Sequence, residues 1–312
     1  MKKINKTKIA LVLCVAAFAL GACEKAEQNS GAEPAQDAGA RQNTDSWQDT
    51  DSRQDADSRQ EADAEIFASI PENPASDFDY DNVDGEIIIY RYLGESKEVS
   101  IPARIDGMDV RAIGEYCFVN DEITAVVCPD TLEIIGAFAF TNCEELVGIR
   151  LNEGLQSIAD HAFLNCPSLE YVSIPGTVTF MGESAFSMTG IRELELLCSA
   201  PELGQSVFSS IDVVELTIPA NLKTVGYMMF VNSQDLETVI IEDGVEKIDK
   251  QAFESCDSLI SVTIPASVTE IGEKAFKKSA FADKSLELVL TVEPGSYAET
   301  YAKENNIAYV NP

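Results

Sequence analysis

The sequence predicts an elongated solenoid of short strands, and three observations support this fold class. A phenylalanine recurs eight times, at intervals of 22 or 23 residues. An apolar residue stands five positions before each phenylalanine, and a strand-like phrase ending in proline recurs with nearly the same spacing. A repeat this short cannot bury its own apolar face, so successive copies must stack. The phenylalanines are Phe118, Phe140, Phe163, Phe186, Phe208, Phe230, Phe253 and Phe276.

Each repeat is expected to form one circuit of a coil. Residues 169–175 alternate Val and Ile as a short strand does, and Pro175 ends the strand where a ladder donor is no longer needed. A second apolar segment, a glycine and a tight corner with the phenylalanine follow. Parallel strands of successive coils should lie about 4.8 Å apart, with the rings stacked inside. Ala159 and Asp249 replace the glycine and Met229 replaces an alanine, so local distortion is predicted there.

Both ends of the solenoid are predicted to be covered. Residues 78–92 alternate apolar side chains around an Asp-Gly pair, which is typical of a β-hairpin. Ser296 opens a capping box and a short helix, and a final strand follows at residues 307–310. An insertion at residues 280–284 delays the strand at 286–292, and the register of that strand stays open.

The repeat resembles the BspA-like, or Treponema-type, leucine-rich repeats of bacterial surface proteins, whose pattern runs L-x-x-V-x-I-P, then V-x-x-I-G, then A-F-x-x-C. The match extends from about Tyr80 to Pro312. The resemblance implies the α/β class and a leucine-rich-repeat solenoid, a right-handed horseshoe with a parallel β-sheet on its concave face. It also implies short helical corners, and eight repeats plus end caps.

The first 23 residues predict export and a lipid anchor. Four lysines precede a 12-residue apolar run that ends at Leu20, too short to span a bilayer and typical of a signal peptide. The following Gly-Ala-Cys completes a sequence that resembles the lipobox of bacterial lipoproteins. Residues 1–22 are therefore predicted to be removed, and Cys23 to carry acyl chains such as palmitate. An ordinary signal peptide with a chance cysteine is the alternative.

The segment after Cys23 is predicted to be a disordered acidic tether. It is poor in apolar residues and rich in Asp, Glu, Gln and Ser, so it cannot bury enough surface to offset its ordering entropy. A hexad recurs three times at residues 45–62, and a helix with paired charges is the alternative. The predicted domains are the tether at 23–76 and the repeat domain at 77–312, with a cap at 77–110, repeats at 111–292 and a cap at 293–312.

Composition argues against several functions. The net charge of −31 disfavours nucleic acid, whose phosphates need clustered Lys and Arg. The acidic run from Asp77 to Asp84 lacks the Gly and Glu that a calcium loop needs, because Asn82 and Ile88 stand there. His161 is the only histidine and is expected at the surface. We therefore predict no enzyme, metal or cofactor; a hydrolase using loop carboxylates is a remote alternative.

Six cysteines are predicted to be buried thiols that act as small apolar side chains. No two of them form a Cys-x-x-Cys pair, which disfavours zinc. A disulfide between Cys143 and Cys166, in adjacent coils, is the alternative. The six are Cys117, Cys128, Cys143, Cys166, Cys198 and Cys256.

A column of outward-facing residues is the predicted binding face. In each strand phrase the residue between the two inward aliphatics points away from the core. The mixture of apolar, hydroxyl and charged groups suits a protein-binding surface, since hot spots favour aromatic and Arg anchors. A role in keeping the sheet soluble is the alternative. The candidates, with two flanking residues, are Val127, Arg150, Tyr171, Ser173, Glu195, Thr217, Thr238, Ile240 and Thr263.

The predicted function is non-enzymatic binding of an extracellular protein or glycan, as in adhesion to a host or another microbe. The protein is expected to be a monomer at the outer face of a bacterial membrane, held there by its lipid anchor only. A structural or assembly lipoprotein of the cell's own envelope is the alternative function.

Overall fold

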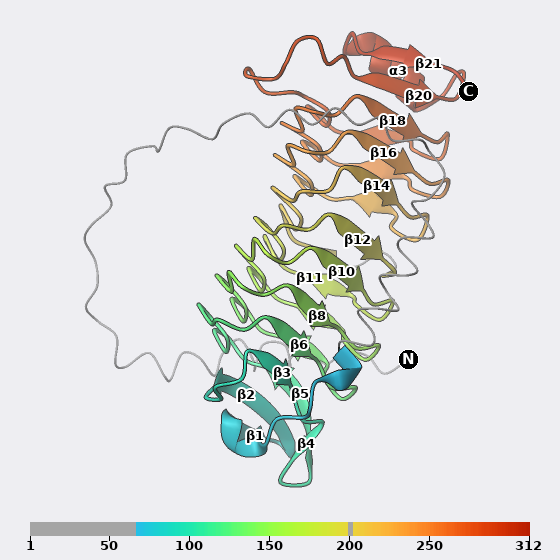
Figure 1. The fold of residues 1–312 in the computed structure, drawn as a ribbon. Helices are drawn as coiled ribbons and strands as arrows, with labels where there is room; N and C mark the ends of the chain where they lie inside the picture. The colour runs from blue at the N-terminus through green and yellow to red at the C-terminus, as the bar shows by residue number, and fades with distance from the viewer. Residues whose placement is uncertain (1–66, 199–201) are drawn as a thin grey trace, which may run out of the picture. The chain divides into compact units, whose positions relative to one another are not determined.

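The computed structural model describes residues 67–198 and 202–312. The chain divides into two units, Met1–Ser69 and Ile70–Pro312, and the second unit contains the repeats. This unit is a parallel solenoid in which each repeat forms one coil, as predicted (Figure 1). The predicted signal segment, Cys23 and residues 24–66 of the predicted tether lie outside the described residues.

The strand phrases with proline form one side of the coil, here called the long-strand ladder. Alternation buries Val172 and Ile174 completely and leaves Tyr171 and Ser173 half-buried at the surface. The strands lie in three parallel sheets, β3-β6-β8, β10-β12 and β14-β16-β18-β20-β21. Their bounds are β3 (Glu98–Ser100), β6 (Ala125–Val127), β8 (Gly148–Arg150), β10 (Tyr171–Ile174), β12 (Glu193–Leu196), β14 (Glu215–Ile218), β16 (Thr238–Ile241), β18 (Ser261–Ile264), β20 (Val289–Val292) and β21 (Ala308–Val310).

The second apolar segments form another side, the short-strand ladder. Most of its strands have only two residues, and they pair in parallel as β2-β5-β7-β9-β11-β13 and β15-β17-β19. Their bounds are β2 (Glu86–Tyr92), β5 (Met108–Ile113), β7 (Ile134–Ile135), β9 (Ser157–Ile158), β11 (Phe180–Met181), β13 (Glu202–Leu203), β15 (Thr224–Val225), β17 (Lys247–Ile248) and β19 (Glu270–Ile271). β4 (Arg104–Ile105) pairs with β5 as a small antiparallel hairpin.

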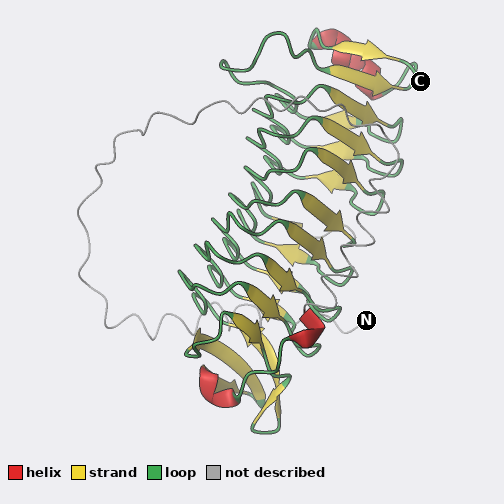
Figure 2. Cartoon of the chain, in the orientation of Figure 1, coloured by secondary structure: helices red, strands yellow, loops and turns green. Residues whose placement is uncertain are grey.

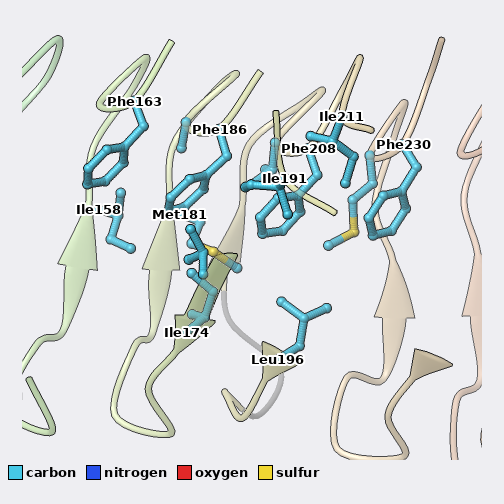
Figure 3. Close-up of a cluster of buried hydrophobic side chains, with 14 of the residues drawn as sticks. Ile158, Phe163, Ile174, Met181, Phe186, Ile191, Leu196, Phe208, Ile211 and Phe230 are labelled. Atoms are coloured by element: carbon cyan, nitrogen blue, oxygen red, sulfur yellow. The ribbon is translucent and has the colours of Figure 1, made fainter. Parts of the chain in front are cut away.

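The repeat phenylalanines form a continuous column of stacked rings in the core (Figure 3). Consecutive ring centroids lie 4.8–5.7 Å apart, and the planes differ by at most 12°. Tyr92 continues the column at one end, 5.5 Å from Phe118, and Tyr301 closes it at the other, 6.2 Å from Phe276. The predicted internal column is confirmed, and both caps extend it.

The corners around the phenylalanines consist of turns, where the family pattern led us to expect short helices (Figure 2). Phe138 and Asn142, two residues before and two residues after Phe140, have positive φ angles of 56° and 59°. In every other corner the residue two positions before the phenylalanine has positive φ, alone or together with the residue two positions after it. Left-handed residues interrupt a helix, so the backbone groups bond to the next coil: Phe140 N–H donates to Ala162 C=O at 2.7 Å. We refer to these bonds as the corner ladder.

The predicted distortions at Ala159 and Asp249 are absent. Their N–H groups donate to Ile135 and Val225 of the preceding coils at 2.9 and 2.8 Å, as the repeat glycines other than Gly226 do at the same place. The short-strand ladder continues through both positions. A Cβ is therefore accommodated at these two corners.

The N-terminal hairpin is confirmed, and the solenoid begins earlier than predicted. β1 (Phe78–Val83) pairs with β2 around Asp84 and Gly85, whose φ angles of 56° and 86° suit a two-residue hairpin turn. Ile70 is buried, and Asn73 exchanges hydrogen bonds with Ser100 of β3. Residues 70–76 were assigned to the tether because they are largely polar, yet they pack on the first coil.

The C-terminal cap also matches the prediction. Helix α3 (Tyr297–Glu304) begins after Ser296, whose Oγ accepts from Glu299 N–H at 3.1 Å. β20 pairs with β18 so that Val289 lies opposite Ser261, which sets the register that the sequence left open. In the part of the chain that the structure describes, no helix has the length and apolar character needed to cross a bilayer.

The six predicted thiols are free and buried. Three of them hydrogen-bond to phenylalanine carbonyls of the previous coil: Cys143 to Phe118, Cys166 to Phe140 and Cys256 to Phe230, at 3.0–3.1 Å. Burial raises the pKa of Cys128 and of Cys256 to about 12, and that of Cys198 to about 11. The thiols of Cys128, Cys198 and Cys256 therefore remain protonated in the folded protein at neutral and mildly alkaline pH.

We expect the six buried thiols to resist alkylation until the solenoid unfolds. A pulse of iodoacetamide at pH 8.5 should leave them unmodified in buffer and modify all six in denaturant, as counted by mass spectrometry. Unfolded thiols ionise near pH 8.5. Above that pH the unfolded state therefore binds fewer protons than the folded state, so stability should fall as pH rises toward the folded pKa values. Fast native labelling would contradict the assigned burial.

Candidate functional site

The outward positions of the long-strand ladder align in two columns, which together form the sheet face. Parallel register places Tyr171 opposite Glu193 and Ser173 opposite Glu195. The first column is Glu98, Ala125, Gly148, Tyr171, Glu193, Glu215, Thr238, Ser261, Val289 and Ala308. The second column is Ser100, Val127, Arg150, Ser173, Glu195, Thr217, Ile240, Thr263, Thr291 and Val310.

Eight of the nine predicted face residues reach solvent. Arg150, Thr217 and Ile240 are exposed, and the others are half-buried: Tyr171, Ser173, Glu195, Thr238 and Thr263. Val127 is only 5% exposed, which corrects the prediction. It lies between Ser100 and Arg150 in the ladder, and neighbours about 4.8 Å away on both sides leave a short branched side chain little contact with water.

Strands β8, β10 and β12 carry a polar cluster on the sheet face. Ser173 Oγ donates to Glu195 Oε2 at 2.6 Å, and Tyr171 Oη donates to the same oxygen at 3.5 Å. Arg150 stands in the same column, one coil before Ser173. Two hydroxyl donors from one strand thus hold the Glu195 carboxylate in place, with an exposed guanidinium nearby in the column.

Strands β16 to β21 present a different surface, without charged residues in either column. Ile240 is 48% exposed and lies between Thr217 and Thr263 in its column. The rest of this surface consists of Thr238, Thr291 and other small or β-branched residues. Sequence reasoning missed the β20 and β21 residues of this half, because the insertion obscured their register. It also missed Glu193 and Glu215. Each stands two residues before a predicted outward residue, Glu195 or Thr217, so strand alternation could have identified both.

Groups suited to metal chemistry or histidine catalysis are not assembled on this face. Within residues 67–198 and 202–312, no three His, Cys, Asp or Glu side chains are placed to hold a metal ion. His161 is half-buried in a corner, where its ring lies 4.8 Å from that of Phe138. The face offers a fixed carboxylate, a guanidinium, hydroxyls and exposed aliphatics, which suit recognition of an extended partner surface.

Comparison with solved structures identifies one protein of the same architecture and a second similar chain. A leucine-rich-repeat protein of T. pallidum shares 25% identity with a TM-score of 0.51, covering 78% of this chain and 98% of its own. A leucine-rich-repeat protein of Bacteroides capillosus ATCC 29799 shares 28% identity, covering 40% of this chain and 96% of its own, with a TM-score of 0.37. No curated protein matches the chain.

The repeats themselves match a defined family. The BspA-type leucine-rich repeat region matches residues 111–237 and 229–299, in six copies, which is more than half of the chain. Repeats of this kind are typically non-enzymatic protein-binding modules of surface proteins. The resemblance seen in the strand, proline and phenylalanine spacing is thus confirmed, and the chain belongs to the BspA-type leucine-rich repeat family.

Proposed function

We propose that this chain is a non-enzymatic lipoprotein of the bacterial cell envelope whose sheet face binds proteins or glycans outside the cell. The observation that carries the proposal is the sheet face itself. Its outward side chains are aligned by backbone pairing, and they include Arg150, Tyr171 and Ile240, the aromatic, arginine and aliphatic types that anchor interfaces. Rigid strands hold such anchors with little loss of entropy on binding.

The chain's charge and N-terminal sequence support the location. A net charge of −31 repels an anionic bilayer, so membrane attachment would depend on the predicted acyl chains at Cys23. The polar segment between Cys23 and Ile70 would then separate the repeats from the membrane. Binding partners with basic groups are favoured by the same negative charge.

The test is binding of the purified chain to arrays of extracellular proteins and of glycans, followed by substitutions on the sheet face. Arg150→Ala and Ile240→Ser should each weaken binding to an array hit by at least about tenfold, the scale of a moderate hot spot. Arg104→Ala and Phe281→Ser are the matched controls, because both residues are exposed outside the sheet face.

Equal losses from face and control variants would contradict the assignment of the sheet face. Absence of any array binding by a correctly folded chain would favour the alternative, a structural lipoprotein of the cell's own envelope. Circular dichroism on each variant separates loss of binding from loss of folding, since none of the four side chains is buried.

A further inference from the structure

Both strand ladders are interrupted at the same place along the solenoid. β13 ends one short-strand sheet and β15 begins the next, while β12 ends a long-strand sheet and β14 begins another. The long-strand ladder is also interrupted between β8 and β10, but there the short-strand ladder continues through β7, β9 and β11. We call the place between the coils of Phe208 and Phe230 the open junction; it lies between strands β12 and β14 in Figure 1.

A backbone hydrogen bond present at the other coils is missing at the open junction. The residue after each short strand donates its N–H to the preceding coil at 2.6–2.9 Å. Gly226, by contrast, donates to Met229 Sδ of its own coil at 3.4 Å. The residues with the regular bond are Gly114, Gly136, Ala159, Gly182, Gly204, Asp249 and Gly272.

The coils are also farther apart here. A Cβ added to Gly136 would lie 2.8 Å from the backbone carbonyl carbon of Gly114, whereas one added to Gly226 would first meet the side chain of Leu203, at 3.3 Å. The Phe208 and Phe230 rings are 5.7 Å apart, the widest spacing between repeat phenylalanines, but the two pairs that follow are 5.5 Å apart, so the separation is shown by the backbone at Gly226 and not by the rings.

Two side chains explain this separation. The residue before the repeat phenylalanine is Ala or Cys in the other six coils, but it is Val207 and Met229 in the two coils that meet at the open junction. Both are fully buried. Larger side chains at this inward position need more room between coils than alanine does, and two-residue strands have few bonds with which to resist.

The corner ladder remains intact through the open junction. Phe208 N–H donates to Met229 C=O at 2.9 Å, and Ser210 N–H donates to Val231 C=O at 3.0 Å. On the long-strand side, the Asn221 side chain donates to the carbonyls of Leu197 and Cys198, at 2.9 and 2.8 Å. Near the corner, Ile211 N–H also donates to Ser233 Oγ at 3.4 Å and Asn232 Nδ2 to Ser210 Oγ at 3.0 Å. Among the described residues, the coils are therefore joined mainly along the corner, and the long-strand side contributes the hydrogen bonds of the Asn221 side chain.

We propose that the open junction is a hinge that divides the described part of the solenoid into two rigid blocks, residues 70–198 with 202–211 on one side and residues 213–312 on the other. The blocks change their relative angle about the corner ladder, because that ladder keeps its backbone bonds while both strand ladders lack them. The bulky pair Val207 and Met229 is the cause, since it holds apart coils that alanine would let close.

The hinge has a consequence for recognition that rests on the proposed function. One block carries Arg150 and the Ser173–Glu195 pair, and the other carries the uncharged surface around Ile240. A partner that contacts both blocks would select one angle between them. The hinge itself does not depend on such a partner and can be tested on the free protein.

Hydrogen exchange of the full chain, read by mass spectrometry on overlapping peptides, tests the hinge. The Gly226 amide should exchange at least about tenfold faster than the Gly204 and Gly272 amides, because it lacks the bond to the preceding coil. Equal protection at all three would overturn the proposal, whatever happens in binding assays.

The variant Met229→Ala tests the assigned cause. It should lower the ratio of the Gly226 amide exchange rate to the Gly204 amide exchange rate, because a smaller side chain lets the coils approach each other. The ratio corrects for any general loss of stability. An unchanged or larger ratio would show that Met229 does not hold the junction open. Val207→Ala gives the same readout if the first variant fails to fold.

Discussion

Replacing Phe163 by alanine should lower the free energy of unfolding by about 3–5 kcal/mol, the cost of deleting a buried aromatic ring. The Phe163 side chain is fully buried, and its ring lies 5.0 Å from that of Phe140. On the other side it lies 4.8 Å from the ring of Phe186, the neighbour seen in Figure 3. Rings on both sides prevent the cavity from collapsing. For a domain of this size the melting temperature should fall by roughly 6–20 °C, measurable by calorimetry.

Phe281→Ala is the matched control for this prediction. Phe281 is 97% exposed in the insertion before β20, outside the ring column. Its removal should change the free energy of unfolding by no more than about 0.5 kcal/mol. Similar losses in the two variants would contradict the claim that the stacked column stabilises the solenoid.

The repeat architecture was predictable because its signals are local and recur. Each phenylalanine, with an apolar residue five positions earlier, indicates the same packing, and eight copies make chance agreement negligible. The hairpin around Asp84 and the helix after Ser296 have equally local causes in turn and capping chemistry. The start at Ile70 was missed because one buried aliphatic in a polar segment gives no periodic signal.

The sheet face was predictable only as a single column. Alternation within a strand indicates which side chains point outward, so Arg150 and Ile240 were identified correctly as exposed. The bond between Ser173 and Glu195 depends on the register of two strands that lie 22 residues apart in sequence. The near-complete burial of Val127 likewise depends on its neighbours in space.

The open junction shows how a visible irregularity can be misjudged from sequence. Ala159 and Asp249 depart from the repeat pattern and leave the ladder unchanged. Met229, the third departure from the pattern, was expected to distort its corner, and it does lie at the open junction, where Gly226 keeps the pattern but the ladder is interrupted. The difference arises because Val207 and Met229 act together across two coils, whereas a single unusual residue can be accommodated within one coil.

Gly204→Ala and Gly226→Ala form a pair that should differ strongly in stability. A Cβ at Gly204 would lie 2.5 Å from the carbonyl carbon of Gly182, so two backbone segments would have to separate. We expect a loss of about 2–3 kcal/mol or more, as for an overpacked core. Chemical denaturation monitored by circular dichroism would measure it.

Gly226→Ala should stay within about 1 kcal/mol of the unchanged protein, since the nearest atom to the new Cβ is the flexible end of Leu203, at 3.3 Å. Neither glycine has positive φ, so backbone strain does not distinguish the two. Alanine also restricts the unfolded chain, which favours folding by about 0.4–1 kcal/mol where the native conformation permits it. Equal losses of unfolding free energy at the two positions would mean that the coils approach as closely at Gly226 as they do at Gly204. The open junction would then have no effect on stability.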